Sequence, residues 1–199
     1  MRNIVIQKLF FFDLSLLGDK SHVLVQVLDF QSVKRLKLFN KKSQREEAFL
    51  ETVLKYRTTT TDTNDGELAA FCNYACAFPT SCLCLIDTYH TLESGLPNFI
   101  AVAKALDDFG YAPKGVRLDS GDLVALSKGC KAAFENVVGN EPGRKAAFGN
   151  LTIVASNDIN EAVLEAFSEK GHSLTAFGIG TNLVTCQAQP ALGCVYKLG

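Results

Sequence analysis

The residues best suited to chemistry lie in short polar clusters, and each cluster directly follows an apolar segment of the chain. In residues 115–123, GVRLDSGDL, the guanidinium of Arg117 is a cation that can hold a phosphate or diphosphate. Asp119, two residues later, is a carboxylate suited to ribose hydroxyls or to Mg²⁺. The same residues could instead form an ion pair on the surface at the start of a helix. That simpler interpretation would be preferred if this cluster stood alone.

Similar clusters end three other apolar segments. Asp87 follows the apolar residues of LCLIDTYH (83–90), and Ser156 and Asn157 follow those of LTIVASND (151–158). For the last of these, simple helix capping is an adequate explanation of Asp158. The segment LTAFGIGTN (174–182) ends in a glycine turn whose backbone N–H groups could cradle a phosphate, although an ordinary tight turn explains it equally well. The candidate residues of that turn are Gly178, Gly180 and Thr181.

The segments that follow the first three clusters have the apolar spacing of helices. We expect helices over residues 96–110, 122–139 and 158–171, with a capping box at Asp158 and Glu161 and a C-cap at Gly171. Alternating strands and helices predict an α/β fold with a parallel sheet. All four clusters then fall at the carboxyl edge of the sheet, where α/β proteins place their sites. We therefore expect a site there, with its residues around one cavity: Asp87, Arg117, Asp119, Asn157 and Gly180.

The first part of the chain has a less regular pattern. Residues 22–30 alternate enough for a strand, and residues 34–56 form a charged amphipathic segment that is predicted to be helical toward its end. Residues 57–66, RTTTTDTNDG, are typical of a polar linker or turn. Residues 67–78 predict a helix that Pro79 ends.

Composition excludes several classes of function. A formal net charge of −1 over 199 residues supplies no basic field for nucleic acid or an anionic membrane. No apolar run is long enough to span a bilayer, and Lys8 and Asp13 interrupt the apolar start, so we expect no signal peptide. The seven cysteines lack the spacing of a zinc site, and we expect reduced thiols in a cytosolic protein and no metal held by the protein alone.

Several long motifs, in one order, closely resemble nicotinate phosphoribosyltransferase. They are DTYHTLESGLPNFIAVAKAL, GVRLDSGDL, ASNDINE and FGIGTNLVTCQAQPALGCVYKL, and the likeness extends from about Gly66 to Gly199. The resemblance implies a type II phosphoribosyltransferase fold, so we expect a partial α/β barrel with parallel strands. It divides the chain into a divergent N-terminal segment with the polar linker, residues 1–65, and the partial barrel that carries the phosphoribosyl-binding motifs, residues 66–199.

The resemblance also implies a reaction. The family makes nicotinate mononucleotide and diphosphate from nicotinate and phosphoribosyl diphosphate, with coupled ATP hydrolysis; Mg²⁺ would help to hold the diphosphate. The family usually works as a dimer, and we expect a homodimer or association with a full-length subunit in the cytosol. By this resemblance Arg117 and Asp119 contact the phosphoribosyl group, and His22 aligns with the histidine that ATP phosphorylates. Substrate-binding roles are implied as well for Asp87, Ser156, Asn157, Gly178, Gly180 and Thr181.

Two departures from the family pattern shape the expected activity. The family's N-terminal half, with an aromatic residue that stacks on nicotinate and an arginine-rich motif, has no counterpart here, so we expect the chain to be inactive alone. Asp19 replaces a family threonine just before His22 and places negative charge where phosphate should approach. Two alternatives stay open: a non-catalytic remnant that binds a full-length subunit or a phosphorylated ligand, and an unrelated phosphate-binding α/β domain.

Overall fold

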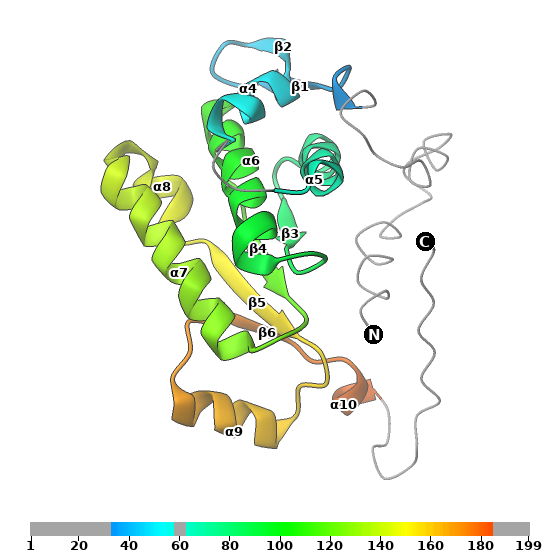
Figure 1. Cartoon of the computed structure of the whole chain (residues 1–199). Helices are drawn as coiled ribbons and strands as arrows, with labels where there is room; N and C mark the ends of the chain where they lie inside the picture. The colour runs from blue at the N-terminus through cyan, green and yellow to red at the C-terminus, as the bar shows by residue number, and fades with distance from the viewer. Residues whose placement is uncertain (1–32, 58–62, 185–199) are drawn as a thin grey trace.

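The computed structural model describes residues 33–57 and 63–184, which form a mixed α/β structure around a parallel sheet (Figure 1). The four strands of that sheet lie side by side in chain order. They are β3 (Leu83–Leu85), β4 (Gly115–Leu118), β5 (Thr152–Ser156) and β6 (Ala176–Gly178). All three neighbouring pairs are parallel, as the alternation of strands and helices predicts.

Each of the first three strands is followed by a long helix near its predicted position. These helices are α6 (Leu96–Asp108), α7 (Leu123–Asn140) and α9 (Glu161–Lys170). The predicted capping box at Asp158 is wrong, because the side chain of Asn160 accepts the hydrogen bond from the backbone N–H of Val163. Asp158 instead has a φ of +50° and belongs to the turn between β5 and α9. At the other end, Gly171 is the C-cap, as predicted.

The central strands present different residues on their two faces. Val116 and Leu118 of β4 are completely buried, and so is Ala155 of β5, whereas Arg117 and Val154 are only partly buried. Because successive side chains of a strand point to opposite faces, Arg117 lies on the face opposite to these apolar residues. Arg117 and Val154 are also paired in the register of β4 with β5.

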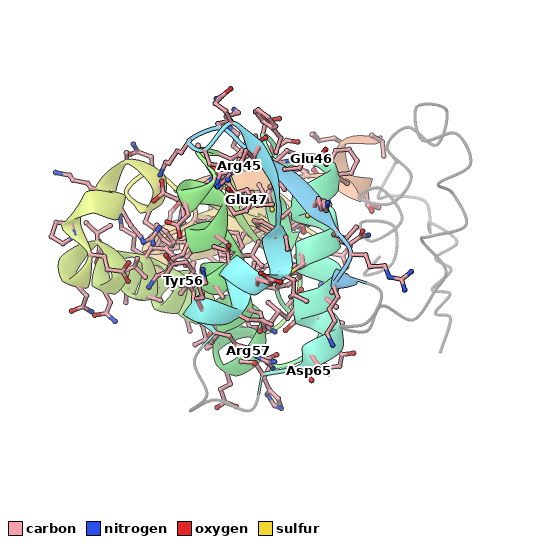
Figure 2. The ribbon with its side chains drawn as sticks, turned by 90° about the horizontal axis from the view of Figure 1, so that it is seen from above. Arg45, Glu46, Glu47, Tyr56, Arg57 and Asp65 are labelled. Atoms are coloured by element: carbon pink, nitrogen blue, oxygen red, sulfur yellow. The ribbon has the colours of Figure 1, made fainter. Side chains whose placement is uncertain are left out.

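The first described part of the chain departs from the sequence-based expectation. The segment predicted as amphipathic begins with an antiparallel hairpin of β1 (Lys37–Asn40) and β2 (Arg45–Ala48). The side chain of Asn40 accepts hydrogen bonds from the N–H groups of Lys42 and Ser43 and so closes the turn. Figure 2 views this hairpin from above, with Arg45 and Glu47 on β2.

Two helices follow the hairpin. Helix α4 (Phe49–Tyr56) is the helical end predicted for residues 34–56. Helix α5 (Asp65–Ala77) begins two residues before the predicted Glu67, because the side chain of Asn64 accepts from the Glu67 N–H and caps it. Arg57 and Asp65, both labelled in Figure 2, form an ion pair of 2.5 Å that links the residues around the two helix ends.

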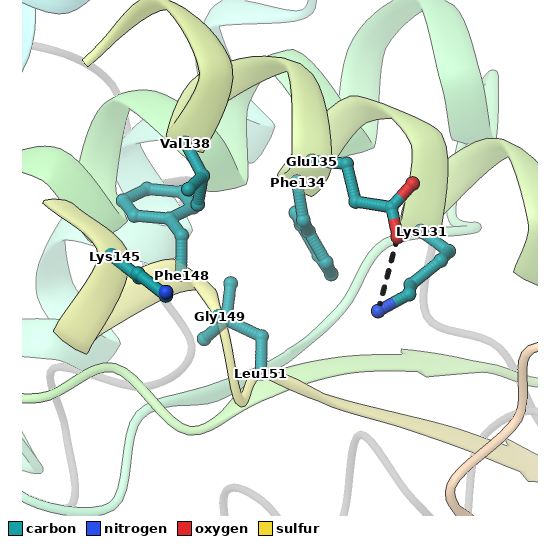
Figure 3. A pocket seen from close by; sticks show the side chains of 8 residues that line it. All are labelled: Lys131, Phe134, Glu135, Val138, Lys145, Phe148, Gly149 and Leu151. Carbon is teal, nitrogen blue, oxygen red and sulfur yellow. Dashed lines mark ion pairs between the residues drawn. The ribbon is translucent and has the colours of Figure 1, made fainter. Parts of the chain in front are cut away.

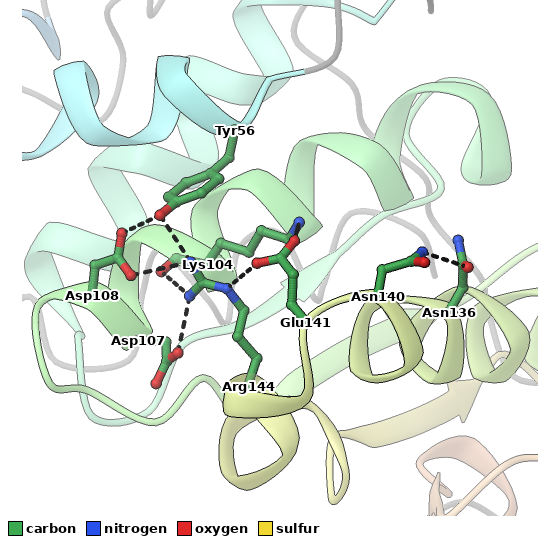
Figure 4. Close-up of polar contacts among 8 residues, drawn as sticks. All are labelled: Tyr56, Lys104, Asp107, Asp108, Asn136, Asn140, Glu141 and Arg144. Atoms are coloured by element: carbon green, nitrogen blue, oxygen red, sulfur yellow. Dashed lines mark hydrogen bonds and ion pairs between the residues drawn. The ribbon is translucent and has the colours of Figure 1, made fainter.

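An ionic network centred on Arg144 ties the helices together (Figure 4). Arg144 ends the short 3₁₀ turn η3 (Pro142–Arg144), which precedes α8 (Lys145–Phe148). Its guanidinium contacts Asp107 at 2.9 Å, Asp108 at 3.1 Å and Glu141 at 2.6 Å. It also donates to the hydroxyl of Tyr56 on α4 at 2.8 Å. One partly buried cation therefore joins α4, the end of α6 and the segment that follows α7.

Five cysteines are free thiols, of which Cys72, Cys82, Cys84 and Cys130 are buried; Cys186 and Cys194 lie outside the described residues. No helix within residues 33–57 and 63–184 is both long and apolar enough to cross a membrane.

Candidate functional site

The structure brings five polar residues together where β3, β4 and β5 end. We call this group the strand-end cluster: Asp87, Arg117, Asp119, Ser120 and Ser156. Asp87 comes two residues after β3, Arg117 lies within β4, Asp119 and Ser120 follow it, and Ser156 is the last residue of β5. The carboxyl ends of neighbouring parallel strands meet at one edge of a sheet, and this places residues far apart in the chain side by side.

Arg117, Ser156 and Asp119 form a closed triangle of hydrogen bonds. Arg117 Nε donates to Ser156 Oγ at 2.7 Å, and Arg117 Nη2 lies 3.1 Å from Asp119 Oδ1. Ser156 Oγ in turn donates to the same Asp119 oxygen at 2.6 Å. The hydroxyl thus accepts from one neighbour and donates to the other, and each side chain limits the rotation of the other two.

Asp87 joins this triangle from the next strand. Its Oδ2 accepts from the backbone N–H of Asp119 at 2.9 Å and from the hydroxyl of Ser120 at 2.6 Å. Asp87 therefore fixes the turn that follows β4, and it brings a second carboxylate close to the one guanidinium. A cluster with two carboxylates and one guanidinium favours an additional cation or a ligand that donates hydrogen bonds.

Asp119 is the most deeply buried member of the cluster, and one of its carboxylate oxygens makes no hydrogen bond to the described residues. The residue is 2% exposed, and its Oδ2 atom has no hydrogen-bond partner within the described part of the chain. A buried carboxylate oxygen normally has a partner, because losing its hydration is costly. Burial also lowers the pKa of Arg117, an effect that the neighbouring Asp119 and Asp87 oppose. A ligand hydroxyl could supply the missing donor to Asp119.

The remaining predicted site residues belong to the ends of β5 and β6 and to the turns after them, or lie outside the described residues. Asn157 follows Ser156 directly, is exposed and has a φ of +97°, a left-handed conformation that Asn tolerates better than most residues. Gly178 pairs with Ser156 across β5 and β6, and a Cβ at this glycine would lie 3.3 Å from the Ser156 Cβ. Gly180 and Thr181 come after β6, where Thr181 begins the four-residue helix α10 (Thr181–Val184). His22 lies outside the described residues.

The sequence did not reveal Ser120 as a site residue, nor a second, buried polar group. Ser120 is part of the motif that contains Asp119, and its place two residues after the end of the strand was the available signal. The second group is centred on Glu67, which was assigned only to a helix. A charged residue at the start of the mostly apolar run ELAAFCNYACAF was the signal that could have singled it out.

A small pocket of about 160 Å³ lies at the other edge of the sheet (Figure 3). Its lining includes Phe134 and Val138 of α7, Phe148 of α8, and Leu151. Leu151 directly precedes β5, whereas the strand-end cluster lies beyond the carboxyl end of that strand. The pocket is therefore separate from the cluster.

No group of three or more His, Cys, Asp or Glu side chains in the described ranges could hold a metal ion. A Mg²⁺ ion that is bound to a diphosphate needs fewer protein ligands. It usually keeps several waters and binds one or two protein carboxylates together with the substrate phosphates. The unpartnered oxygen of Asp119 fits that smaller requirement. It fits a ribose hydroxyl equally well.

Comparisons with known proteins point to one family. Residues 48–199 match the model of the nicotinate phosphoribosyltransferase (NAPRTase) family. The chain is 53% identical over 137 residues to nicotinate phosphoribosyltransferase 2 of Arabidopsis thaliana, an alignment that covers 69% of this chain and 24% of that protein. It is 48% identical over 156 residues to nicotinate phosphoribosyltransferase of Caenorhabditis elegans, covering 78% of this chain and 28% of that protein.

A solved structure agrees with the sequence matches. The crystal structure of human nicotinic acid phosphoribosyltransferase superposes with a TM-score of 0.66 at 31% identity, covering 73% of this chain and 30% of the human one. The chain therefore spans about a quarter of the length of the curated relatives it matches, with values of 24% and 28% for the two above.

Proposed function

Because this chain belongs to the nicotinate phosphoribosyltransferase family, we propose that its strand-end cluster binds the phosphoribosyl group of phosphoribosyl diphosphate. The cluster would work within an enzyme that transfers this group to nicotinate and so forms nicotinate mononucleotide, a step of NAD biosynthesis. The observation that carries the proposal is the buried Oδ2 atom of Asp119, which lacks a partner among the described residues, beside the cation of Arg117. A ribose hydroxyl would donate a hydrogen bond to this Asp119 oxygen, and a phosphate oxygen would pair with the guanidinium of Arg117.

The family's chemistry gives each residue of the cluster a role. Breaking the bond between ribose C1 and diphosphate leaves positive charge on the ring, and a nearby carboxylate such as Asp119 would stabilise it. Asp87 would form the floor of the site through its bonds to Asp119 and Ser120. Ser156 and Asn157 would line the same site. The proposed contacts to the 5′-phosphate are from Gly178, Gly180 and Thr181.

Mg²⁺ and ATP belong to the same proposal. Two carboxylates next to one guanidinium would repel a bare diphosphate, so the substrate should arrive with Mg²⁺, which neutralises its charge. Asp119 is the residue best suited to meet that ion. We further propose ATP as a co-substrate with His22 as the histidine that it phosphorylates.

Assembly and location extend the proposal to the whole enzyme. The sequential strand order of the sheet is the order of an α/β barrel, and we propose that the sheet is part of one. A homodimer, or association with a full-length subunit, is proposed as the working state. The five free thiols favour the reducing cytosol as its location.

Ligand titration tests the proposal directly. We expect the chain to bind ribose 5-phosphate and Asp119→Asn to weaken that binding about 10- to 100-fold, since one hydrogen bond to a charged group contributes about 1.5–3 kcal/mol. Isothermal titration calorimetry with ribose 5-phosphate and with nicotinate measures both affinities. Nicotinate should bind more weakly, because the family's aromatic stacking residue has no counterpart in this chain.

The matched control for this titration is Asp122→Asn. Asp122 is exposed and caps α7 through the Ala125 N–H, and asparagine caps a helix about as well as aspartate. This variant should bind ribose 5-phosphate like the unmodified chain. Nicotinate binding that equals or exceeds that of ribose 5-phosphate would refute the proposal, as would an Asp119→Asn variant with unchanged affinity.

A further inference from the structure

A buried polar group lies near the segment that carries Asp87, and none of its members takes part in the chemistry proposed above. We call it the Glu67 group: Asn64, Glu67, Ser94 and Asn98. Glu67 is 5% exposed, Ser94 is 3% exposed and Asn98 is fully buried. Glu67 Oε2 accepts from the Ser94 hydroxyl at 2.6 Å and from Asn98 Nδ2 at 3.0 Å. The three buried residues belong to three elements, α5, η2 (Thr91–Gly95) and α6.

The hydroxyl of Ser94 completes the N-terminal cap of α5. In a capping box the third helical residue accepts a hydrogen bond from the N–H of the capping residue. Here the Asn64 N–H donates to Ser94 Oγ at 2.9 Å, and Ser94 Oγ donates to Glu67. Glu67 therefore reaches the cap through a side chain of η2, and this fixes the position of η2 against the start of α5.

The other side of η2 lies against Ile86, which follows β3 and directly precedes Asp87. A Cβ added at Gly95 would lie 1.9 Å from the carbonyl oxygen of Ile86, so only glycine allows this approach. Ile86 in turn donates its N–H to the carbonyl of Arg117 at 3.2 Å. η2 is a π-helical turn, in which Gly95 N–H donates to the carbonyl of His90, and such turns are frequent at functional sites.

We propose that Glu67 is a positioning residue that holds Asp87 in place through Ser94 and the close contact of Gly95 with Ile86. Each link is short: Glu67 to Ser94 at 2.6 Å, Gly95 against Ile86, and Asp87 to the Asp119 N–H at 2.9 Å. Removing the carboxyl of Glu67 frees η2, and Asp87 then loses its fixed position under the turn after β4. The role of Asp87 in substrate binding rests on the proposed function, whereas the link from Glu67 to Asp87 does not.

The burial of Glu67 and the lack of further donors around it in the described part of the chain favour its neutral form. Glu67 Oε1 and Asn98 Oδ1 are both buried acceptors that lack a donor among the residues described. A proton on Glu67 supplies a donor to a group that is short of one. Burial raises the pKa of Glu67, the bonds from Ser94 and Asn98 oppose this, and the charge of Asp87 adds to it. Cys84 on β3 is the other titratable group that interacts with Glu67, and Ser94, Asn98 and Asn64 carry no charge.

Stability should consequently depend on the pH through Glu67. Its pKa in the folded protein lies above the ordinary value of 4.5, so its stabilising effect is complete below that pH and is lost as the pH rises through the folded-state pKa. Glu67→Gln keeps a neutral side chain at every pH and should lack this loss. Urea unfolding of both proteins between about pH 4.5 and pH 8 measures how the free energy of unfolding changes with pH. If this pH dependence is the same in both proteins, Glu67 is charged in the folded protein and the prediction is wrong.

Hydrogen exchange at one amide tests the positioning without any ligand. The Asp119 N–H donates to Asp87, so its exchange rate in ¹H–¹⁵N NMR spectra reports whether Asp87 is held. We expect Glu67→Ala to raise the exchange rate of the Asp119 amide at least about 10-fold relative to the amides of β5. A 10-fold increase corresponds to a loss of about 1.4 kcal/mol in the free energy that protects this amide. Glu67→Gln should stay close to the unmodified chain. Ser94→Ala, which cuts the same link, serves if Glu67→Ala does not fold.

Glu93→Ala is the matched control, because Glu93 lies on η2 beside Ser94 and is exposed. It should leave the Asp119 amide unchanged. Unchanged exchange at Asp119 in both Glu67→Ala and Ser94→Ala would overturn the proposal, and so would an increase that is uniform over all amides, which indicates global destabilisation. Titration of the same variants with ribose 5-phosphate separates the two proposals: if the unmodified chain does not bind it, the proposed function fails, and exchange at Asp119 still decides the role of Glu67.

Discussion

The purified 199-residue chain is expected to form no nicotinate mononucleotide when it is mixed with nicotinate, phosphoribosyl diphosphate, ATP and Mg²⁺. Transfer requires both substrates to be held in one orientation, and such alignment can supply about 7–11 kcal/mol of the barrier. In the proposed function the strand-end cluster binds only the phosphoribosyl part, and the chain spans only 24% of the Arabidopsis relative. Chromatographic detection of product, with a full-length relative assayed in parallel as the positive control, measures the effect.

An Asp119→Ala variant completes this experiment. If the unmodified chain turns over substrate and Asp119→Ala abolishes the turnover, the prediction is wrong, and residues 1–199 contain everything that the reaction requires. Turnover that survives in Asp119→Ala would point to a contaminating enzyme, because Asp119 is a central residue of the proposed site.

Replacing Arg144 with methionine is expected to lower the free energy of unfolding by about 3 kcal/mol, because the carboxylates around it then lose their positive partner and repel one another. The Arg144 side chain is 12% exposed and contacts Asp107, Asp108 and Glu141, which are 28%, 35% and 38% exposed. Their partial exposure puts the effect at the lower end for a buried ion pair. Urea unfolding near neutral pH measures it.

The ion pair of Lys131 with Glu135 is the matched control. It joins exposed side chains four residues apart on α7 at 3.3 Å, so Lys131→Met should change stability by less than about 0.5 kcal/mol. An Arg144→Met effect as small as this would show that the network of Figure 4 contributes little to stability.

Acid unfolding gives the Arg144 network a second readout. The hydrogen bonds from Lys104 and Arg144 lower the pKa of Glu141, so its contribution to stability is present above an ordinary carboxyl pKa near 4.5 and is lost as the pH falls through the lower value. Arg144→Met should therefore lose less stability than the unmodified chain when the pH falls below about 4.5.

Local signals in the sequence are enough to predict the repeated units of this fold. Apolar runs such as LTIVAS and helical spacing such as that of residues 96–108 depend only on neighbouring residues, and the structure has strands and helices there. The hairpin of β1 and β2 was missed because REEA carries three charges and has no alternating apolar residues. The Asn40 side chain closes the turn of this hairpin, but a single asparagine in the sequence is equally typical of an ordinary polar loop.

The order of the amino acids is enough to identify the polar residues near strand ends, since an apolar run gives way there to residues such as Asp87, Asp119 and Ser156. Which of these side chains touch one another depends on how the strands pair in the folded protein. Arg117 and Ser156 are 39 residues apart in the chain, and their contact depends on the pairing of β4 with β5.

The same distinction explains why the sequence predicts only a helix at Glu67. Its partners Ser94 and Asn98 lie 27 and 31 residues away and belong to other elements. A carboxyl group in a helical run is compatible with a solvated surface until packing removes its water. Burial is a property of the assembled fold, so packing alone decided that Glu67 lies inside the protein and needs hydrogen-bond partners there.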